Sequence, residues 1–189
     1  MGRHTIDDVV EAAGRLFGER GFHGTSMRDL GAELGLLGSS LYSHIGSKQE
    51  LLIAVIEKGS RFFEAAADAA EATPGSGADR VAAFVGGHLD VVLDHRDEVR
   101  TFLNEARFLE PEERAGAVAL RDRYEERLRA LLREGIEDGS FSADLDVPLA
   151  SISILSILNT VERWHRDDGR LDRAGLAEAL TTRVLALLQ

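Results

Sequence analysis

Apolar residues recur every three or four positions along most of the chain, which is the spacing expected of amphipathic helices. The first such run extends from Ile6 to Phe17 and leaves one face polar. Thr5 precedes it and, with Asp8 three residues later, has the pattern of a capping box. Gly21 is typical of the residue that follows a helix. The pattern therefore predicts a first helix between Thr5 and Gly21.

A second and a third helix are expected close behind the first. The second is capped by Thr25 or Ser26 and ends at Gly35, and about four residues separate it from a short helix at roughly 39–44. Two helices joined by so tight a turn have the layout of a helix-turn-helix. Such a motif needs small and polar side chains on the outer face of its second helix, because that helix lies in the major groove of DNA.

The fourth helix is predicted to start after Ser47, which forms a capping box with Glu50, and to run to about Glu71. It ends before the turn signal "TPGSG" at 73–77. The alternation in "SISILSIL", 151–158, is compatible with a strand, but its helical flanks favour a helix. The prediction is an all-α fold of about nine helices. The later ones are expected at about 78–95, 97–109, 111–138, 148–166 and 173–188.

Composition excludes several classes of site and of protein. The chain has 189 residues and no cysteine, so disulfides and cysteine-ligated metal sites are excluded. No stretch provides the roughly 20 consecutive apolar residues that span a bilayer. The N-terminus also lacks the apolar core of a signal peptide. We therefore expect a cytoplasmic protein that is not bound to a membrane.

The formal net charge of -11 is unevenly distributed along the chain. Residues 1–48 contain five Lys or Arg and six Asp or Glu, a net charge of -1, whereas residues 49–189 contain 17 and 27, a net charge of -10. The segment 34–48, "LGLLGSSLYSHIGSK", contains no acidic residue. Because carboxylates are repelled by DNA phosphates, this segment could face nucleic acid. A connector that lacks acidic residues by chance is the alternative.

Individual side chains of this segment suit a DNA contact. Leu41 can pack inward, while small serines occupy the outer face of the short helix. Tyr42 and His44 are long enough to reach phosphates. Lys48 falls in the first turn of the fourth helix, where the positive end of the helix dipole attracts a phosphate.

The segment "TSMRDLGAELGLLGSSLYSHIGSKQELL" resembles the DNA-binding segment of the tetracycline-repressor (TetR) family of bacterial regulators. "VVEAAGRLFGERGFHGTS", which overlaps its start, is similar to the first helix of that family. The resemblance implies a helix-turn-helix DNA-binding domain at 1–48 and a ligand-binding and dimerisation domain at 49–189. It also implies that the fourth helix, at about 48–71, links the two.

The resemblance further implies roles for single residues. The chain departs from the family at Leu37, where a helix-capping Ser or Thr is usual. The cap then moves to Ser39 or is lost, at a cost of about 1 kcal/mol. Phosphate contacts are implied for Thr25, Tyr42 and Lys48, and positions at or near base edges for Arg28, Ser39, Ser40 and His44.

Polar residues interrupt the apolar stripes of two later segments, 100–128 and 151–172. An apolar wall with a few polar anchors is typical of a small-molecule pocket. For each residue, a helix–helix interface with solvated arginines is the alternative. The candidate ligand-binding residues are Asn104, Arg107, Arg121, Tyr124, Thr160, Arg163 and Trp164.

The combination of "ARFL-x-P-x-x-R", "LRDRYE" and "ERWHRDDGRLD" resembles the TetR branch that senses acyl-coenzyme A thioesters. Such an effector needs an apolar tunnel for its acyl chain and cations for its phosphates. The resemblance therefore implies a repressor that leaves its palindromic operator when a small hydrophobic or acyl-CoA-type effector binds. The candidate cations are Arg107, Arg121, Arg163 and Arg166.

The last two predicted helices, 148–166 and 173–188, are candidates for a homodimer face. Two such helix pairs would form a four-helix interface between subunits. A helix buried in the core of its own subunit is the alternative. The apolar residues of the last helix repeat at three- and four-residue spacing, as Leu176, Leu180, Val184 and Leu187 or Leu188.

No arrangement typical of an enzyme is visible, and no cofactor is implied. His88 and His95 lie seven residues apart and would suggest a metal site only with Glu98; two exposed histidines are the simpler explanation. Phosphate-binding glycine loops are absent from the sequence. A helical interaction module without a DNA role is the second function class that stays open. Salt-dependent binding to a palindromic operator would separate the two.

Overall fold

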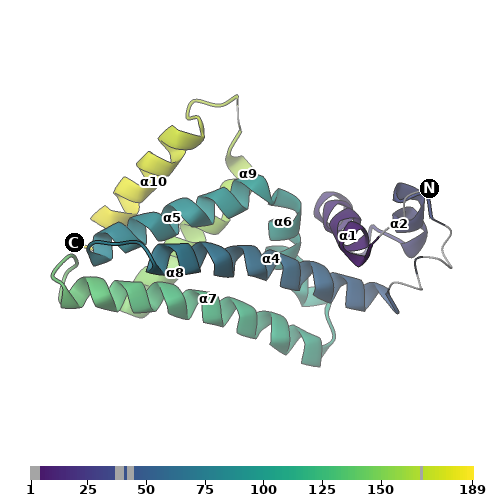
Figure 1. Ribbon diagram of the computed structural model, residues 1–189, viewed down its shortest axis with the longest axis horizontal. Helices are drawn as coiled ribbons and strands as arrows, with labels where there is room; N and C mark the ends of the chain where they lie inside the picture. The colour runs from purple at the N-terminus through teal and green to yellow at the C-terminus, as the bar shows by residue number, and fades with distance from the viewer. Residues whose placement is uncertain (1–4, 37–40, 42–44, 167) are drawn as a thin grey trace. The chain divides into compact units, whose positions relative to one another are not determined.

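The computed structural model describes residues 5–36, 41, 45–166 and 168–189. Every regular element in these residues is a helix, which confirms the predicted all-α fold (Figure 1). The chain forms two compact units, Met1–Arg61 with His95–Leu120 and Phe62–Asp94 with Arg121–Gln189. Within the described part, no helix is both long enough and apolar enough to cross a membrane.

The first unit starts with α1 (Ile6–Arg20), whose two ends agree with the prediction. Thr5 Oγ1 accepts a hydrogen bond from Asp8 N, and Asp8 Oδ2 accepts one from Thr5 N at 2.7 Å. At the other end Gly21 has a φ of +74°, which favours glycine, and donates its N–H to Phe17 O. The predicted capping box and helix end are confirmed.

Ser26, rather than Thr25, caps α2 (Met27–Glu33). Ser26 Oγ accepts a hydrogen bond from Asp29 N at 3.1 Å, and Asp29 Oδ2 accepts one from Ser26 N at 2.8 Å. The hydroxyl of Thr25 instead donates to backbone carbonyl groups of the preceding segment. The choice that the sequence left open between these two residues is thereby settled.

The segment predicted as the third helix falls largely outside the described residues, which omit 37–40 and 42–44. Within it the structure describes Leu41, which is helical and fully buried. Its burial agrees with the inward packing expected of this side chain. The helix cap discussed for Leu37 and Ser39 lies outside the described residues.

α6 (Arg96–Asn104) packs on α1 at a separation that requires glycine. A Cβ atom added at Gly18 would lie 2.9 Å from Asp97 Cα, and one added at Gly14 would lie 3.2 Å from Glu98 Cγ. The first of these distances is shorter than real Cβ contacts. The two glycines of α1 therefore set how closely α6 can approach.

The helix predicted at 97–109 is shorter than expected. α6 stops at Asn104, and a 3-10 turn, η1 (Ala106–Phe108), follows it. Leu109 then adopts an extended conformation ahead of α7 (Pro111–Glu137). Glu110, which directly precedes Pro111, is also non-helical, as expected because a residue that precedes proline is disfavoured in the α region.

The second unit contains α5 (Gly77–Asp94), α8 (Val147–Asn159), α9 (Val161–Trp164) and α10 (Arg173–Ala186), with parts of α4 (Lys48–Glu71) and α7. These bounds lie within two residues of the predicted ones, apart from α8 and α9. The segment 151–158 is helical, which confirms the choice of helix over strand. The interior of the second unit is filled by apolar side chains that include Phe63, Phe84, Leu128, Ile154 and Leu158.

The helix predicted at 148–166 is in fact two helices, α8 and α9, which meet at Thr160. Thr160 Oγ1 donates a hydrogen bond to Ile157 O at 2.9 Å. A threonine side chain that bonds to nearby backbone competes with the helical ladder, which accounts for the interruption.

The apolar stripe of α10 faces the interior of its own subunit, because α10 packs on α5. Arg173 at its start binds Asp94 at 2.6 Å and Asp90 at 2.8 Å, both on α5. The alternative of a core helix is therefore correct for the buried part of this stripe, whereas Leu187 is 56% exposed. A dimer face formed by the last two helices stays a prediction. The buried residues are Leu176, Leu180, Val184 and Leu188.

Candidate nucleic-acid interface and ligand-binding sites

The start of α4 is fixed by the residues around its first turn. Ser47 Oγ accepts a hydrogen bond from Glu50 N at 3.1 Å, as the predicted cap requires. Glu50 Oε2 accepts a second one from Gly46 N at 3.0 Å. The first bond satisfies an amide group that the helix start leaves without a helical partner, and the second ties the residue before the cap to the same turn. They place Lys48 in the first turn, where the helix dipole attracts anions.

Lys48 is held over an aromatic ring. Its Nζ lies 4.1 Å from the centroid of the Phe22 ring, a cation–π contact. Burial lowers the pKa of Lys48, and the nearby carboxylate of Asp29 opposes this effect. Hydrogen bonds from Ser26 lower the pKa of Asp29. The ammonium group is therefore positioned by its surroundings.

The turn η1, which is distant in the sequence, packs against the residues around Lys48. Phe108 stacks on Phe22 with ring centroids 6.2 Å apart, and its carbonyl accepts a hydrogen bond from Gln49 Nε2 at 3.0 Å. Glu105, which is buried, accepts one from Phe22 N at 2.7 Å. The sequence analysis missed these residues, because the bonds join positions 59 and 83 residues apart and no local pattern marks them.

Two of the residues predicted to bind DNA, Arg28 and Lys48, interact electrostatically with the carboxylate of Asp29. Arg28 is exposed in the first turn of α2 and helps to lower the pKa of Asp29, and Asp29 in turn favours the charged form of Lys48. Thr25 is only 2% exposed, and its hydroxyl donates to two backbone carbonyls at 3.1 Å. The phosphate contact implied for Thr25 stays a prediction. Outside the described residues lie Ser39, Ser40, Tyr42 and His44.

The candidate ligand-binding residues divide between the two units. In the first unit, Asn104 Nδ2 donates a hydrogen bond to Arg100 O at 2.9 Å. The guanidinium of Arg107 lies 4.7 Å from the centroid of the Phe108 ring and is exposed. In the second unit, burial lowers the pKa of Arg121. Ligand binding by these residues stays a prediction.

Tyr124 lies in an aromatic box inside the second unit. Its ring centroid is 5.1 Å from that of Phe63 and 5.0 Å from that of Phe84. Its hydroxyl is 3.1 Å from His88 Nδ1. Burial lowers the pKa of His88 to about 3, against the opposing effect of Asn159, and burial also raises the pKa of Tyr124. The pair is therefore an uncharged polar group within an apolar interior.

The two histidines considered as metal ligands do not form a metal site with Glu98 in the described residues. His88 is buried in the second unit, so the expectation of two exposed histidines is wrong for it. His95 and Glu98 belong to the first unit, where Glu98 pairs with Lys58 at 3.1 Å. The part of the chain that the structure describes holds no group of three metal-ligating side chains.

The connection between α9 and α10 forms a pocket of about 240 Å³. Trp164, Arg166 and Arg170 line it, and Trp164 is 52% exposed. Arg163 is exposed beside it and bonds to Glu162 at 3.3 Å, while Thr160 is bonded to its own helix. An exposed aromatic face with guanidinium groups can stack on a ring and bind phosphates.

Two sequence models match the chain. The model of bacterial regulatory proteins of the tetR family matches residues 9–55, and that of the tetracyclin repressor-like C-terminal domain matches residues 74–188. The chain belongs to the TetR family. TetR-family proteins are helix-turn-helix transcriptional regulators, so the predicted class of ligand-responsive DNA-binding regulator is confirmed, as is the expectation that the protein is not an enzyme.

Relatives with known structures or names extend this TetR assignment over nearly the whole chain. The TetR-family regulator PfmR from Thermus thermophilus is 36% identical, with a TM-score of 0.86 over 96% of this chain and 98% of that one. AibR, solved with isovaleryl coenzyme A and operator DNA, is 26% identical, with a TM-score of 0.87 over 94% and 96%. The transcriptional repressor KstR2 of Mycobacterium tuberculosis is 28% identical over 166 residues, 87% of this chain and 82% of that protein.

Proposed function

We propose that this TetR-family protein is a homodimeric repressor that leaves a palindromic operator when an acyl-coenzyme A thioester binds. The observation that carries the proposal is the 26% identity, over 94% of the chain, to AibR, whose structure contains isovaleryl coenzyme A and operator DNA. A relative solved with both ligands supports the same two ligand classes for this chain.

The proposal assigns the DNA contact to the domain at 1–48. Support comes from the exposed Arg28 and from the fixed position of Lys48 at the start of α4. The two recognition helices of a dimer would enter successive major grooves about 34 Å apart. Phosphate contacts are assigned to Thr25, Tyr42 and Lys48, and base-edge positions to Arg28, Ser39, Ser40 and His44.

The proposal assigns the effector to the domain at 49–189. The pocket lined by Trp164, Arg166 and Arg170 suits the charged nucleotide end of coenzyme A. The uncharged pair His88–Tyr124 suits the neutral acyl end. The ligand-binding residues proposed are Asn104, Arg107, Arg121, Tyr124, Thr160, Arg163 and Trp164.

The outer face of α8 supports a subunit interface. Ile152, Ser156 and Thr160 are exposed at four-residue spacing, so they lie on one side of α8 and its C-terminal end. An exposed isoleucine among small side chains allows two helices to approach closely. This face of α8, together with the exposed side of α10 at Leu187, is the proposed site of the isologous dimer contact.

α4 supports a direct coupling of the two functions, because one continuous helix carries Lys48 at its start and Glu71 at its end. These ends belong to different compact units. An effector that binds better to one conformation of the protein than to another, the two differing in the placement of α4, would shift the population of DNA-binding conformations. Such a difference in affinity is the only source of free energy for release.

The test starts with selection of operator sequences from a pool of random duplexes by the purified protein. The bound sequences should share an inverted repeat, with affinity that falls steeply as salt rises. Isovaleryl-CoA and longer acyl-CoA thioesters should then release the protein, whereas free coenzyme A and the free acids should not. A pool without an inverted repeat, or release by none of the thioesters, would contradict the proposal.

Two variants assign the roles within this test. Lys48→Ala should weaken binding to all duplexes alike, because a phosphate contact carries no sequence information. Arg163→Ala should leave operator binding intact and reduce release by the thioester, and Arg183→Ala, on the exposed side of α10, is the matched control. Loss of operator binding by Arg163→Ala would indicate a role in folding or dimerisation instead.

A further inference from the structure

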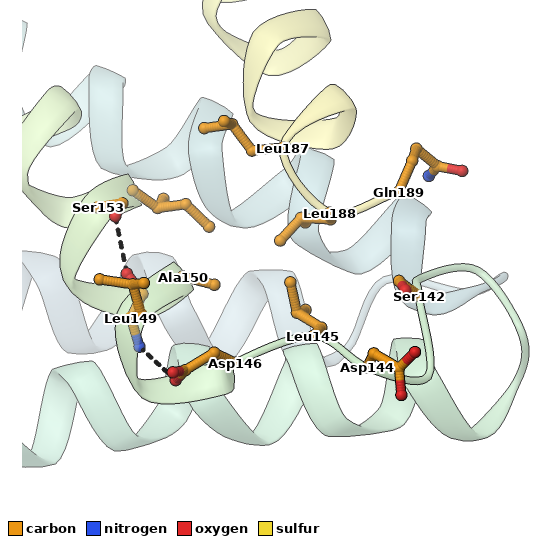
Figure 2. A pocket seen from close by; sticks show the side chains of 11 residues that line it. Ser142, Asp144, Leu145, Asp146, Leu149, Ala150, Ser153, Leu187, Leu188 and Gln189 are labelled. Atoms are coloured by element: carbon orange, nitrogen blue, oxygen red, sulfur yellow. Dashed lines mark hydrogen bonds between the residues drawn. The ribbon is translucent and has the colours of Figure 1, made fainter.

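The second unit contains a second cleft, which the proposed function does not use. It lies between the first turns of α8, the connection that precedes α8 and the end of α10, and has a volume of about 380 Å³ (Figure 2). This volume lies within the range of small-molecule sites. Figure 2 shows Leu145 and Leu188 directed from different segments toward the space beside Ala150.

Hydrogen bonds fix the segments that form this cleft. Ser142 N donates to Leu188 O at 2.9 Å and ties the connection to the end of α10. Asp146 Oδ1 accepts a hydrogen bond from Leu149 N at 3.0 Å and caps α8. These two bonds hold the segments on either side of the cleft.

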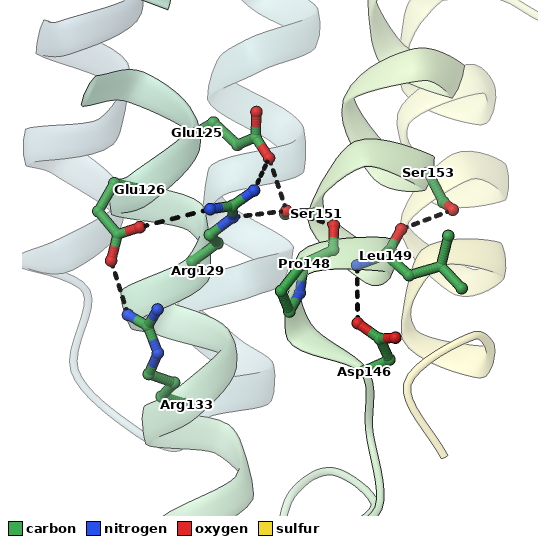
Figure 3. Close-up of polar contacts among 9 residues, drawn as sticks. All are labelled: Glu125, Glu126, Arg129, Arg133, Asp146, Pro148, Leu149, Ser151 and Ser153. Atoms are coloured by element: carbon green, nitrogen blue, oxygen red, sulfur yellow. Dashed lines mark hydrogen bonds and ion pairs between the residues drawn. The ribbon is translucent and has the colours of Figure 1, made fainter. Parts of the chain in front are cut away.

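α8 is also anchored to α7 by a charged network (Figure 3). Ser151, which is fully buried, donates its hydroxyl proton to Glu125 Oε1 at 3.0 Å and receives a hydrogen bond from Arg129 Nε at 3.1 Å. Glu126 extends the network to Arg133 at 2.8 Å. This network therefore holds α8 against α7 at Ser151, between the lining residues Ala150 and Ser153 of the cleft.

The cleft combines apolar walls with negative charge. Leu149 and Leu187 are 61% and 56% exposed, so two large apolar side chains at its margin face solvent. Its charged lining residues are Asp144 and Asp146, and none of the described Lys, Arg or His residues lines it. The pocket beside Trp164 has the opposite character, because its charged lining residues include two arginines.

The balance of charge in the cleft stays negative when the helix dipole is included. The start of α8 contributes the equivalent of about +0.5 elementary charge. The carboxylate of Asp146 offsets this charge at the cap, and the carboxylate of Asp144 is exposed at the margin. Charge complementarity therefore favours a cation over an anion, and the apolar walls favour one with a hydrocarbon body.

We propose that this cleft binds an apolar ammonium compound, whose hydrocarbon part lies against the leucines and whose cationic nitrogen lies near Asp144. The proposal goes beyond the acyl-CoA response and does not depend on it. Leu149 lies one turn before Ile152, so the cleft opens at the edge of the proposed dimer face. A compound bound there would touch both the cleft and that edge.

The experiment compares three probes that share one hydrocarbon chain: octylammonium, 1-octanol and octanoate. Binding to the full-length protein is measured by titration calorimetry at low salt and neutral pH, below the concentrations at which the probes self-associate. We expect octylammonium to bind at least fivefold more tightly than 1-octanol, and octanoate to bind most weakly. Tighter binding of octanoate than of octylammonium would overturn the proposal.

Two matched variants locate the site. Asp144→Asn should weaken octylammonium about tenfold and leave 1-octanol unchanged, while Asp168→Asn, an exposed aspartate outside the cleft, should change neither. An equal effect of both variants would overturn the proposal, because it would indicate non-specific attraction to an acidic protein.

A third variant tests whether a second copy of the chain covers the cleft. If octylammonium binds the wild-type dimer, sedimentation should show that the dimer persists with the probe bound. If the wild type binds no probe and Leu149→Ser produces monomers, the occupant of the cleft is the second copy and the proposal is overturned. This experiment contains neither DNA nor coenzyme A, so its failure is distinguishable from failure of the proposed function.

Discussion

Each of the two compact units is stabilised by a different kind of internal interaction. In the first unit, α6 approaches α1 at two glycines, and side chains bond to main-chain groups, as Glu105 does to Phe22 N and Arg100 to Gly18 O. In the second unit, an aromatic interior is joined by ion pairs between side chains of neighbouring helices. Close backbone contact permits few substitutions, whereas side-chain ion pairs at a surface permit many. The first unit should therefore be less tolerant of small changes in side-chain size.

The largest effect is expected from the interior of the second unit. Phe84→Ala removes a fully buried ring that stacks on Tyr124, and should lower the free energy of unfolding by about 3–5 kcal/mol. Amide hydrogen exchange, read separately for α5 and α1, measures this loss. Equal loss of protection in both helices would show that the two units unfold together and would remove the distinction between them.

A pair of glycine substitutions tests the close contact in the first unit. Gly18→Ala places a Cβ 2.9 Å from Asp97 Cα and should destabilise the protein by about 1–3 kcal/mol. Gly86→Ala, on α5, meets no atom within 4 Å and should stabilise it by up to about 1 kcal/mol. Chemical denaturation measures both. Similar effects at the two sites would show that the approach of α6 to α1 is not limiting.

The buried histidine of the second unit predicts a pH dependence. The pKa of His88 is lowered to about 3 in the folded protein, so the unfolded chain binds the proton more readily below its ordinary pKa of about 6.5. This contribution to stability is complete well above pH 6.5 and is lost as the pH falls toward 3, with about 2 kcal/mol lost at pH 5.

His88→Gln provides the comparison for this pH dependence. The variant keeps a polar side chain but loses the titrating group, so its unfolding free energy should change less between pH 6.5 and pH 5. Parallel pH profiles of the two proteins, measured by urea denaturation, would show that His88 is not the group responsible.

The smallest effect is expected from the ion pairs of the second unit. Arg127 of α7 binds Glu64, Asp68 and Glu71 of α4 at 2.6 to 2.9 Å. Because Asp68 and Glu71 are exposed, Arg127→Met should cost only about 1 kcal/mol, and less in 1 M salt. Thermal denaturation at two salt concentrations measures this. A loss that does not change with salt would indicate packing of the Arg127 side chain instead.

Features that depend on neighbouring residues could be predicted from the sequence. The box formed by Thr5 with Asp8 and the cap at Ser47 involve residues three apart, so their chemistry is visible in the letters alone. The interruption at Thr160 was missed, because it depends on a rotamer that bonds to Ile157 O. Glycines in a helix also gave no sign that α6 would lie against Gly18.

Features that depend on distant residues could not be predicted. The periodicity of α10 indicated a buried face, but it carried no information on whether α5 or a second subunit covers that face. The bond of Glu105 to Phe22 joins positions 83 residues apart. For the proposed sites, the residue types in 34–48 and around Trp164 indicated DNA and an anionic ligand, whereas the support of Lys48 by η1 required the fold.

The most direct test of the account is the reciprocity of its two ligands. The affinity of the full-length protein for the releasing acyl-CoA thioester is measured with and without its selected operator. Coupling between the DNA-binding and effector domains predicts that bound operator weakens the thioester, typically by a factor between about 5 and 150, and that the thioester weakens the operator by the same factor. A thioester affinity that operator DNA leaves unchanged would contradict the account.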